Sequence, residues 1–193
     1  MTGAAVKAAL RASRGFYRVT VVDEVDSTNA RVKEWAKAGE AAGAVLIARS
    51  QSVGRGRRGR SFYSPAETGL YMSVLLRPAI APGDTALITT AAAVAACRTV
   101  AASADLQLSI KWVNDLLLGS KKIGGILAEG VPAVYAVLGI GLNLCDPAGG
   151  FPMEIAQCAG SLLGVQPCGE RQREGIAAHF LEELYVLTAA LPR

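Results

Sequence analysis

The sequence contains only one histidine, His179, among its 193 residues. Serine and cysteine nucleophiles in catalytic triads need a neighbouring imidazole as their general base. His179 lies beside Phe180 in an apolar segment near the C-terminus, and we find no acid or nucleophile there for it to work with. We therefore expect no nucleophilic triad and assign His179 no catalytic role.

Cysteine is also scarce, and its four copies form no C-x-x-C pair. Cys97, Cys145, Cys158 and Cys168 have apolar or small neighbours, so we expect buried or free thiols in a reducing compartment. We predict no zinc site and no other metal held by protein ligands.

Long hydrophobic runs are missing too. No stretch approaches eighteen apolar residues, and the first segment lacks the apolar core of a secretory signal. We expect a cytoplasmic protein that binds no membrane. An alternative stays open for residues 1–22, which carry Lys7, Arg11, Arg14 and Arg18 but no acid, because an organelle presequence shares this composition.

Acidic residues are absent from the stretch between Glu40 and Glu67. The same stretch holds five arginines: Arg49, Arg55, Arg57, Arg58 and Arg60. The net charge of the chain is only +4, so the basic character is local. This distribution indicates an anion-binding site.

What is present is enough apolar sequence, 51% of the chain, to build one compact domain. We place this domain at 17–193, after an N-terminal tail or short helix at 1–16. Strands are expected at 17–25, 44–48, 70–76 (stopped by Pro78) and 106–112, with a hairpin of 123–128 and 134–144. One helix is expected to begin at 27–29, and a second to run from about Asp84 to Ala102. A third is expected at the C-terminus, where Ile176, Phe180, Leu184 and Leu187 form an apolar stripe. This order predicts an α+β fold with a mixed central sheet and flanking helices.

Residues 54–60 read Gly-Arg-Gly-Arg-Arg-Gly-Arg. Glycine lets a backbone approach a ligand closely, and arginine offers a planar fork to phosphate or carboxylate. The loop therefore suits the phosphates of a nucleotide. The residues alone leave two alternatives open, a nucleic-acid-binding arginine patch and a solvated loop.

Two further stretches have strands interrupted by glycine. In 111–129, Lys111 precedes an Asn114-Asp115 turn, and Lys122 precedes the pair Gly124-Gly125. Such a stretch can hold a charged ligand, or a hydrated magnesium ion through Asp115, although a β-turn with exposed lysines is the plainer reading. The Gly-Ile-Gly-Leu-Asn run at 139–143 is not a dinucleotide fingerprint, because no third glycine opens a helix. A packed strand with a bulge remains an alternative.

Taken together and in order, these motifs resemble the bacterial biotin protein ligase family. The resemblance rests on Asp26-Ser27-Thr28-Asn29, Gln51, the 54–60 loop, Gly69-Leu70-Tyr71-Met72-Ser73, Lys111-Trp112-Val113-Asn114-Asp115, Lys122 with 125–127, and 139–143. It covers roughly 17–190. It implies the fold of the biotin and lipoate ligases, which class II aminoacyl-tRNA synthetases share.

The resemblance also implies an activity and a set of site residues. The activity is ATP-dependent formation of biotinyl-5'-AMP and transfer of biotin to a lysine of a carrier protein, with Mg2+ accompanying ATP. Lys122 and Arg57 would be catalytic. The biotin-binding residues would be Ser27, Thr28, Asn29, Gln51, Arg55, Gly56, Arg57 and Lys122. The residues on the ATP and adenylate side would be Arg55, Arg57, Arg58, Arg60, Lys111, Asn114, Asp115 and Asn143.

Some features depart from the family pattern. Val113 stands where proline is often found, and Phe62 stands where tryptophan is common. The stretch before Tyr17 is too short for the DNA-binding domain of regulatory members, and no SH3-like barrel follows the catalytic domain before Arg193. We accordingly expect a short-form enzyme, a monomer or homodimer, that binds no DNA and transfers biotin slowly to the biotin carboxyl carrier protein.

Two rival functions stay open at this point. One is a lipoate or octanoate ligase-like transferase of the same fold, which the arginine loop disfavours. The other is a non-catalytic basic RNA-binding or regulatory protein.

Overall fold

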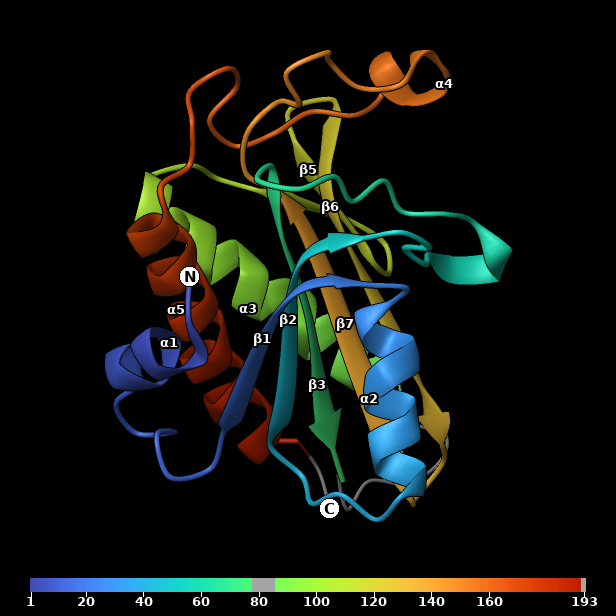
Figure 1. The fold of residues 1–193 in the computed structure, drawn as a ribbon, viewed down its shortest axis with the longest axis vertical. Coiled ribbons are helices and arrows are strands. Elements are labelled where there is room, and N and C mark those ends of the chain that lie inside the picture. Colours follow the sequence, from blue (N-terminus) through green and yellow to red (C-terminus); the bar gives the residue numbers. More distant parts are fainter. Residues whose placement is uncertain (78–85, 192–193) are drawn as a thin grey trace.

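A computed structural model describes residues 1–77 and 86–191. Its centre is a seven-stranded mixed sheet in the order β1-β2-β3-β7-β6-β5-β4 (Figure 1). The strands are β1 (Arg18–Val25), β2 (Ala44–Gln51), β3 (Gly69–Leu76), β4 (Ser109–Lys111), β5 (Asp115–Leu118), β6 (Lys121–Val131) and β7 (Tyr135–Asn143). Only β1 and β2 pair in parallel, and every other neighbouring pair is antiparallel.

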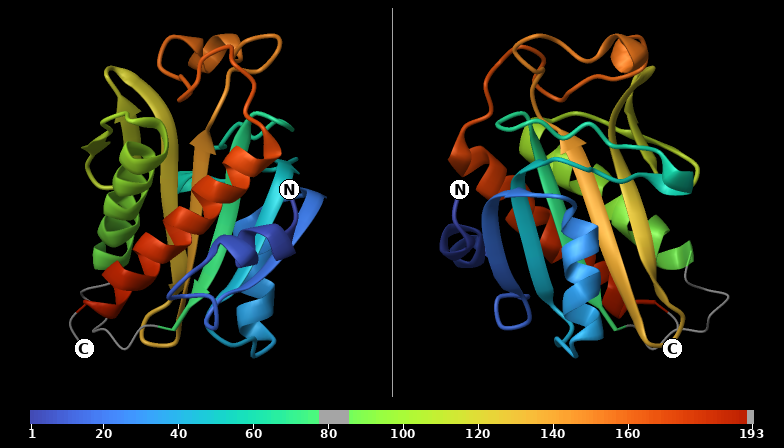
Figure 2. Two further views of the ribbon diagram at one scale, coloured as in Figure 1. Left: turned by 90° about the vertical axis from the view of Figure 1, so that its left-hand side faces the viewer. Right: turned by 45° about the vertical axis from the view of Figure 1, so that its right-hand side comes forward.

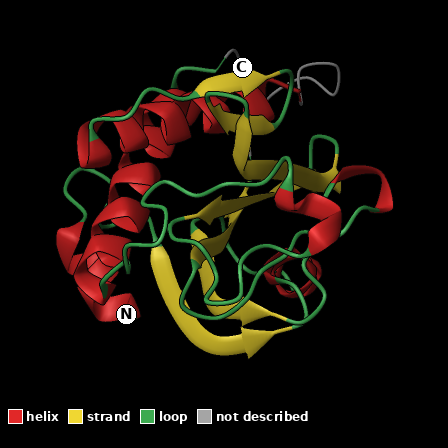
Figure 3. Cartoon of the chain, turned by 90° about the horizontal axis from the view of Figure 1, so that it is seen from above, coloured by secondary structure: helices red, strands yellow, loops and turns green. Residues whose placement is uncertain are grey.

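Helices cover both faces of the sheet, as the turned views show (Figure 2). Helix α2 (Thr28–Lys37) lies on one face, against β2, β3 and β7. On the other face α3 (Ala86–Ala104) packs against α5 (Glu170–Ala189), and α1 (Gly3–Ala9) packs against α5 and β1. A single turn of 3-10 helix (Arg57–Gly59) and α4 (Met153–Ala156) belong to the connections, and Figure 3 shows these loops from above.

The alternation of side chains along the strands creates two separate cores. In β2, Val45 and Ile47 point to the layer of α3 and α5, whereas Leu46 points to α2. On the α2 face, Val32 of the helix packs with Val137 of β7. Because successive strand residues face opposite sides, the odd-numbered positions of β7 all lie on the α2 face.

Most of the expected elements are confirmed, and one strand was predicted too long. The alternating residues at 106–112 gave a strand, but only Ser109–Lys111 pairs with β5. Leu106 and Leu108 pack against the core outside any strand, while Trp112 is 77% exposed, so the alternation does not mark one buried face. Helix α4 was not predicted. The expected stop at Pro78 and the helix start near Asp84 fall outside the described residues.

Helix α3 is long and apolar enough, by length and composition alone, to cross a membrane. In this fold 44% of the most apolar stretch of the helix is buried inside the protein. Ile88, Ala92, Ala96 and Val100 recur at helical spacing on the buried side and join the core beneath the sheet. The apolar composition is therefore accounted for by packing between α5 and the sheet.

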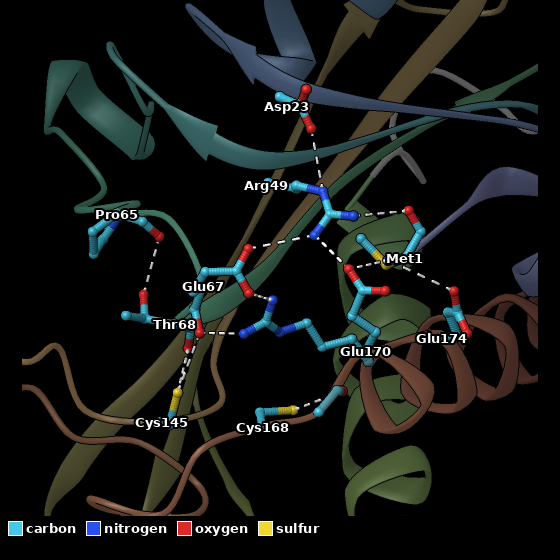
Figure 4. A network of polar contacts seen from close by, with 12 residues as sticks. Met1, Asp23, Arg49, Pro65, Glu67, Thr68, Cys145, Cys168, Glu170 and Glu174 are labelled. Carbon is cyan, nitrogen blue, oxygen red and sulfur yellow. Dashed lines mark hydrogen bonds and ion pairs between the residues drawn. The ribbon is translucent and has the colours of Figure 1, made fainter.

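A network of charges fixes the start of α5 to the sheet and to the segment before β3 (Figure 4). Arg49 of β2 lies 2.7 Å from Glu170 and 3.3 Å from Asp23. Its guanidinium also reaches Glu67 at 3.4 Å, and the buried Arg173 pairs with the same Glu67 carboxylate at 2.6 Å. These contacts hold the chain that leads from the arginine loop into β3.

Candidate active site

A cavity of about 420 Å³ opens on the α2 face of the sheet, beneath the arginine loop. Its walls come from the start of α2, the end of β2, the 54–62 loop, the β4–β5 turn, and strands β6 and β7. All of the sequence-predicted site residues except Asn143 line it: Ser27, Thr28, Asn29, Gln51, Arg55, Gly56, Arg57, Arg58, Arg60, Lys111, Asn114, Asp115 and Lys122. The fold thus brings together segments that are far apart in the sequence.

Glycines make the floor of the cavity. Gly125, Gly139 and Gly141 occupy facing positions on β6 and β7, where Gly125 is paired with Gly141. A Cβ on Gly139 would lie 2.9 Å from Cγ of Asn29, and one on Gly141 would lie 2.6 Å from Cζ of Phe62. Gly139 and Gly141 are therefore required by the close approach of the two side chains above them, whereas a Cβ on Gly125 would make only ordinary contacts.

Gln51 joins the end of β2 to the first turn of α2. Its Oε1 accepts from the backbone N–H of Thr28 at 2.9 Å and lies 3.1 Å from the Thr28 hydroxyl oxygen. Its Nε2 donates to Ser64 Oγ at 3.0 Å. An N–H at the start of a helix has no partner within the helix, so the Gln51 side chain caps α2. The capping fixes the side chain at the cavity wall.

Asn29 lies deeper, with 4% of its surface exposed, and its amide is already engaged within the protein. Nδ2 donates to the Leu127 carbonyl and to Glu129 Oε2, while Oδ1 lies 2.6 Å from Ser73 Oγ. Glu129 also pairs with Lys33 at 3.0 Å. Asn29 lines the cavity, but both of its N–H groups are already used within the protein. Its predicted role in binding biotin stays a prediction.

Ser73 and Glu129 were quoted within sequence motifs but given no role, and Ser64 and Lys33 were not singled out. The Gly-Leu-Tyr-Met-Ser run was the only sequence signal for Ser73. Burial raises the pKa of Glu129, but the hydrogen bonds from Asn29 and Lys33 outweigh it and leave the pKa below its usual value. The carboxylate is thus held in its ionised form.

The arginine loop folds as a small hairpin over the cavity. Phe62 N–H donates to the Gly54 carbonyl at 2.8 Å, and Gly56 N–H donates to the Arg60 carbonyl at 2.7 Å. Arg58 sits at the tip with φ of 57°, and all four arginines of the loop are exposed. The hairpin presents these guanidinium groups at the cavity mouth. None of the four takes part in an ion pair among the described residues.

Phe62 occupies the position where tryptophan is common in the family. Its ring lies over Gly141 and meets Tyr71 edge to face, with ring centroids 6.4 Å apart. Across the cavity mouth, the ring of Trp112 is largely exposed. These aromatic side chains give the cavity apolar surface beside its cationic loop.

A chain of polar contacts connects the loop to Lys122. Lys122 Nζ lies 2.7 Å from Asp115 Oδ1, which also accepts from Asn114 Nδ2 at 2.8 Å. Asn114 Oδ1 in turn accepts from Arg57 Nη1 at 3.0 Å. The two cations predicted to be catalytic therefore meet on one Asn-Asp turn. The contacts of Asp115 point to a role in orienting Lys122.

Asn143 is the exception among the predicted site residues. Its Nδ2 donates to the Gly160 carbonyl at 2.9 Å, and it does not line the cavity. Gly160 N–H donates to the Lys122 carbonyl, and Lys122 N–H donates to the Cys158 carbonyl. Asn143 thus anchors the 158–160 segment that pairs with the backbone of Lys122.

Residues 21–143 match the model of the Biotin/lipoate A/B protein ligase family. The chain belongs to this family. It is 37% identical over 164 residues to the bifunctional ligase/repressor BirA of Bacillus spizizenii, covering 82% of the chain and 50% of that protein. It is 35% identical over 178 residues to the biotin--[acetyl-CoA-carboxylase] ligase of Mycobacterium tuberculosis, covering 90% of the chain and 65% of that protein.

Solved structures of biotin protein ligases share the fold. The Aquifex aeolicus enzyme in complex with biotin and ATP superimposes with a TM-score of 0.74 at 27% identity, covering 91% of this chain and 73% of that one. The Leishmania major enzyme in complex with biotinyl-5-AMP gives 0.73 at 26% identity, covering 91% and 76%. The predicted α+β architecture of a biotin/lipoate ligase is confirmed. The chain spans half the length of its Bacillus relative.

Proposed function

We propose that this protein activates biotin with ATP and transfers the biotinyl group to a lysine of a biotin carrier protein. One observation carries the proposal. A single cavity joins the Ser27-Thr28-Asn29 turn and Gln51 to the arginine loop and Lys122. The polar turn suits a ureido ring, which needs both donors and acceptors when buried, and the cationic end suits a carboxylate next to phosphate.

In the first half-reaction an oxygen of the biotin carboxylate attacks the α-phosphorus of ATP, and pyrophosphate leaves with the electrons of the broken P–O bond. Two anions must approach each other. Two unit charges 4 Å apart interact by about 4 kcal/mol at an effective dielectric near 20, so Lys122 and Arg57 can offset much of this repulsion. Asp115 and Asn114 position these two cations before the substrates bind.

In the second half-reaction the neutral ε-amine of the acceptor lysine attacks the acyl carbon of biotinyl-5'-AMP. An amide bond forms as the nitrogen loses a proton to solvent, the C–O bond to the phosphate breaks, and AMP leaves with the electrons of that bond. Lys122 and the arginine loop face the developing negative charge on the acyl oxygen and on AMP. No protein nucleophile takes part, which agrees with the scarcity of histidine.

Magnesium is proposed as part of the Mg-ATP substrate. Within residues 1–77 and 86–191, no group of three or more His, Cys, Asp or Glu side chains could hold a metal ion. The residues fit an ion that is bound mainly by phosphate oxygens and water, with Asp115 as the one carboxylate among the described residues that line the cavity. The ion would then help to neutralise the phosphates.

The activity is tested by the exchange of labelled pyrophosphate into ATP. Exchange that depends on biotin supports the proposal. Exchange that depends instead on lipoate or octanoate indicates the rival transferase of the same fold. No exchange with any of the three acids, together with tight RNA binding, indicates the non-catalytic rival.

The partners and setting are also proposals. The biotin carboxyl carrier protein is the proposed acceptor, supported by the name of the Mycobacterium relative. A cytoplasmic location is supported by four cysteines that the structure contains as free thiols. We propose a monomer or homodimer that binds neither DNA nor membrane.

A further inference from the structure

The orientation of the Asn29 amide is fixed from outside the cavity. Its Nδ2 lies 2.9 Å from Glu129 Oε2 and 3.2 Å from the Leu127 carbonyl oxygen. Both of these groups can only accept hydrogen bonds, since Glu129 is ionised. Turning the amide over would bring Oδ1 against two acceptors, so the NH2 group must face them. Glu129 itself does not line this cavity, but it lines a neighbouring one of about 590 Å³ that shares Gly56, Arg57 and Arg58 with it.

This orientation sets the direction of the next two hydrogen bonds. Asn29 Oδ1 must accept, so Ser73, 2.6 Å away, gives its only hydroxyl proton to Asn29. The contact of 2.7 Å between Ser73 Oγ and Thr28 Oγ1 then needs the proton of Thr28. The Thr28 proton is consequently directed away from Gln51 Oε1, 3.1 Å distant, which accepts from the Thr28 backbone N–H instead.

Two acceptor oxygens are left with lone pairs at the cavity wall. Thr28 Oγ1 and Gln51 Oε1 lie 3.1 Å apart, within hydrogen-bond distance, but with the Thr28 proton given to Ser73 they face each other as two acceptors. Gln51 cannot turn over, because its Nε2 donates to Ser64 Oγ and Ser64 donates to the Phe62 carbonyl. A ligand that brings an N–H donor to this point would satisfy both oxygens.

We propose that Glu129 is a positioning residue that keeps Thr28 and Gln51 as acceptors, and so gives the cavity its preference for ligands with ureido N–H donors. The inference rests on the proposed function, because it assigns the ureido ring of biotin to this wall. Glu129 acts on this wall through Asn29 and Ser73.

Without Glu129, only the Leu127 carbonyl opposes turning the Asn29 amide over. The turned amide donates to Ser73, Ser73 donates to Thr28, and Thr28 donates to Gln51 Oε1. The direction of these three hydrogen bonds reverses, and the proton of Thr28 occupies the place that a ligand N–H would take. With the hydrogen bonds reversed, the wall accommodates a ligand acceptor better than it does in the native arrangement.

The experiment compares biotin with its two cyclic-carbamate analogues, in each of which an oxygen replaces one ureido N–H. Dissociation constants for all three are measured by calorimetry for the wild-type protein and for Glu129→Ala. The preference is the ratio of the dissociation constant of the analogue to that of biotin. For the analogue whose ring oxygen faces Thr28 and Gln51, this ratio should fall about tenfold in Glu129→Ala, mainly because biotin binds more weakly. Turnover at saturating biotin should change by less than about twofold, because the effect is on ligand binding at this wall.

Two further variants separate positioning from a structural effect. Lys33→Ala removes the partner of Glu129 but keeps the contact between Glu129 and Asn29, so its preference should stay at the wild-type value. Glu129→Gln keeps an acceptor without its charge, so its preference should be intermediate, and it provides the measurement if Glu129→Ala does not fold.

An unchanged preference in folded Glu129 variants, with biotin and the analogues weakened equally, would overturn the inference. A wild-type protein that binds no biotin would overturn the proposed function as well.

Discussion

Lys122 Nζ and Asp115 Oδ1 lie 2.7 Å apart at the bottom of the cationic end of the cavity. Their side chains are 37% and 23% exposed, so the pair is open to a ligand but partly shielded from water. An incoming carboxylate or phosphate can share Lys122 with Asp115. The pair therefore places a cation where the proposed reaction brings two anions together.

Removing the positive charge of Lys122 should slow the first half-reaction. Lys122→Ala is expected to lower biotin-dependent pyrophosphate exchange by about 10²-fold or more, the effect of deleting one preorganised group that stabilises charge. The matched control is Lys121→Ala, because Lys121 Nζ donates to the Ala156 and Gln157 carbonyls at the end of α4 and does not line the cavity. A normally folded Lys122→Ala protein with wild-type exchange would contradict the assigned role.

Arg57 should matter more for keeping the intermediate than for making it. Its contact with Asn114 at 3.0 Å ties the arginine loop across the cavity. In Arg57→Gly this tie is lost, so we expect part of the adenylate-forming activity to remain while biotinyl-5'-AMP escapes. Mass spectrometry of a bystander protein should then find biotin on many lysines. Labelling no broader than with the wild-type protein would show that the loop does not retain the adenylate.

The glycine floor provides a steric test. Gly141→Ala places a methyl group 2.6 Å from Cζ of Phe62, so the ring must move into the cavity. Overpacking of this kind costs about 1–3 kcal/mol. We expect the KM for biotin to rise by about tenfold or more. Gly149→Ala is the control, because an added Cβ there meets no atom within 4 Å. Equal KM values for both variants would rule out the close approach of Phe62.

Acid should weaken the anchoring of α5. The hydrogen bond from Arg173, with the charges of Arg173 and Arg49, lowers the pKa of Glu67 despite its partial burial. A lowered folded-state pKa contributes stability above the unfolded-state value of about 4.3, and this contribution is lost as the pH falls through the folded-state pKa. Urea unfolding should therefore show Glu67→Gln less stable than wild type at pH 6, with the difference shrinking below about pH 4. A difference that stays constant with pH would contradict this role of Glu67.

The fold and the composition of the site could be predicted from the sequence where local patterns and the motif order agree. The 54–60 loop, the Asn-Asp turn and the strand glycines all reach the same cavity. Position within a motif was a poorer guide to contacts. Asn143 belongs to the Gly-Ile-Gly-Leu-Asn run, yet its amide is used by Gly160, a partner seventeen residues away whose position depends on the tertiary fold.

The roles of Glu129 and Ser73 could not be predicted for a related reason. Neither residue lines the cavity, and their effect passes through hydrogen bonds to Asn29 over separations of 100 and 44 residues. The strand predicted at 106–112 was too long for another reason: Leu106 and Leu108 are partly buried against the core without belonging to a strand, and Trp112 is exposed. An alternation of apolar residues thus indicates neither a common buried face nor a backbone pairing partner by itself.

The most direct test of the central claim is to isolate the intermediate. The protein is incubated with biotin and α-labelled Mg-ATP, separated from free nucleotide, and then mixed with a biotin carboxyl carrier domain. Our account predicts bound biotinyl-5'-AMP in near-stoichiometric amount, followed by release of AMP and biotin on a single lysine of the acceptor. Labelled nucleotide that never becomes joined to biotin, in a protein that is folded and binds ATP, would contradict it.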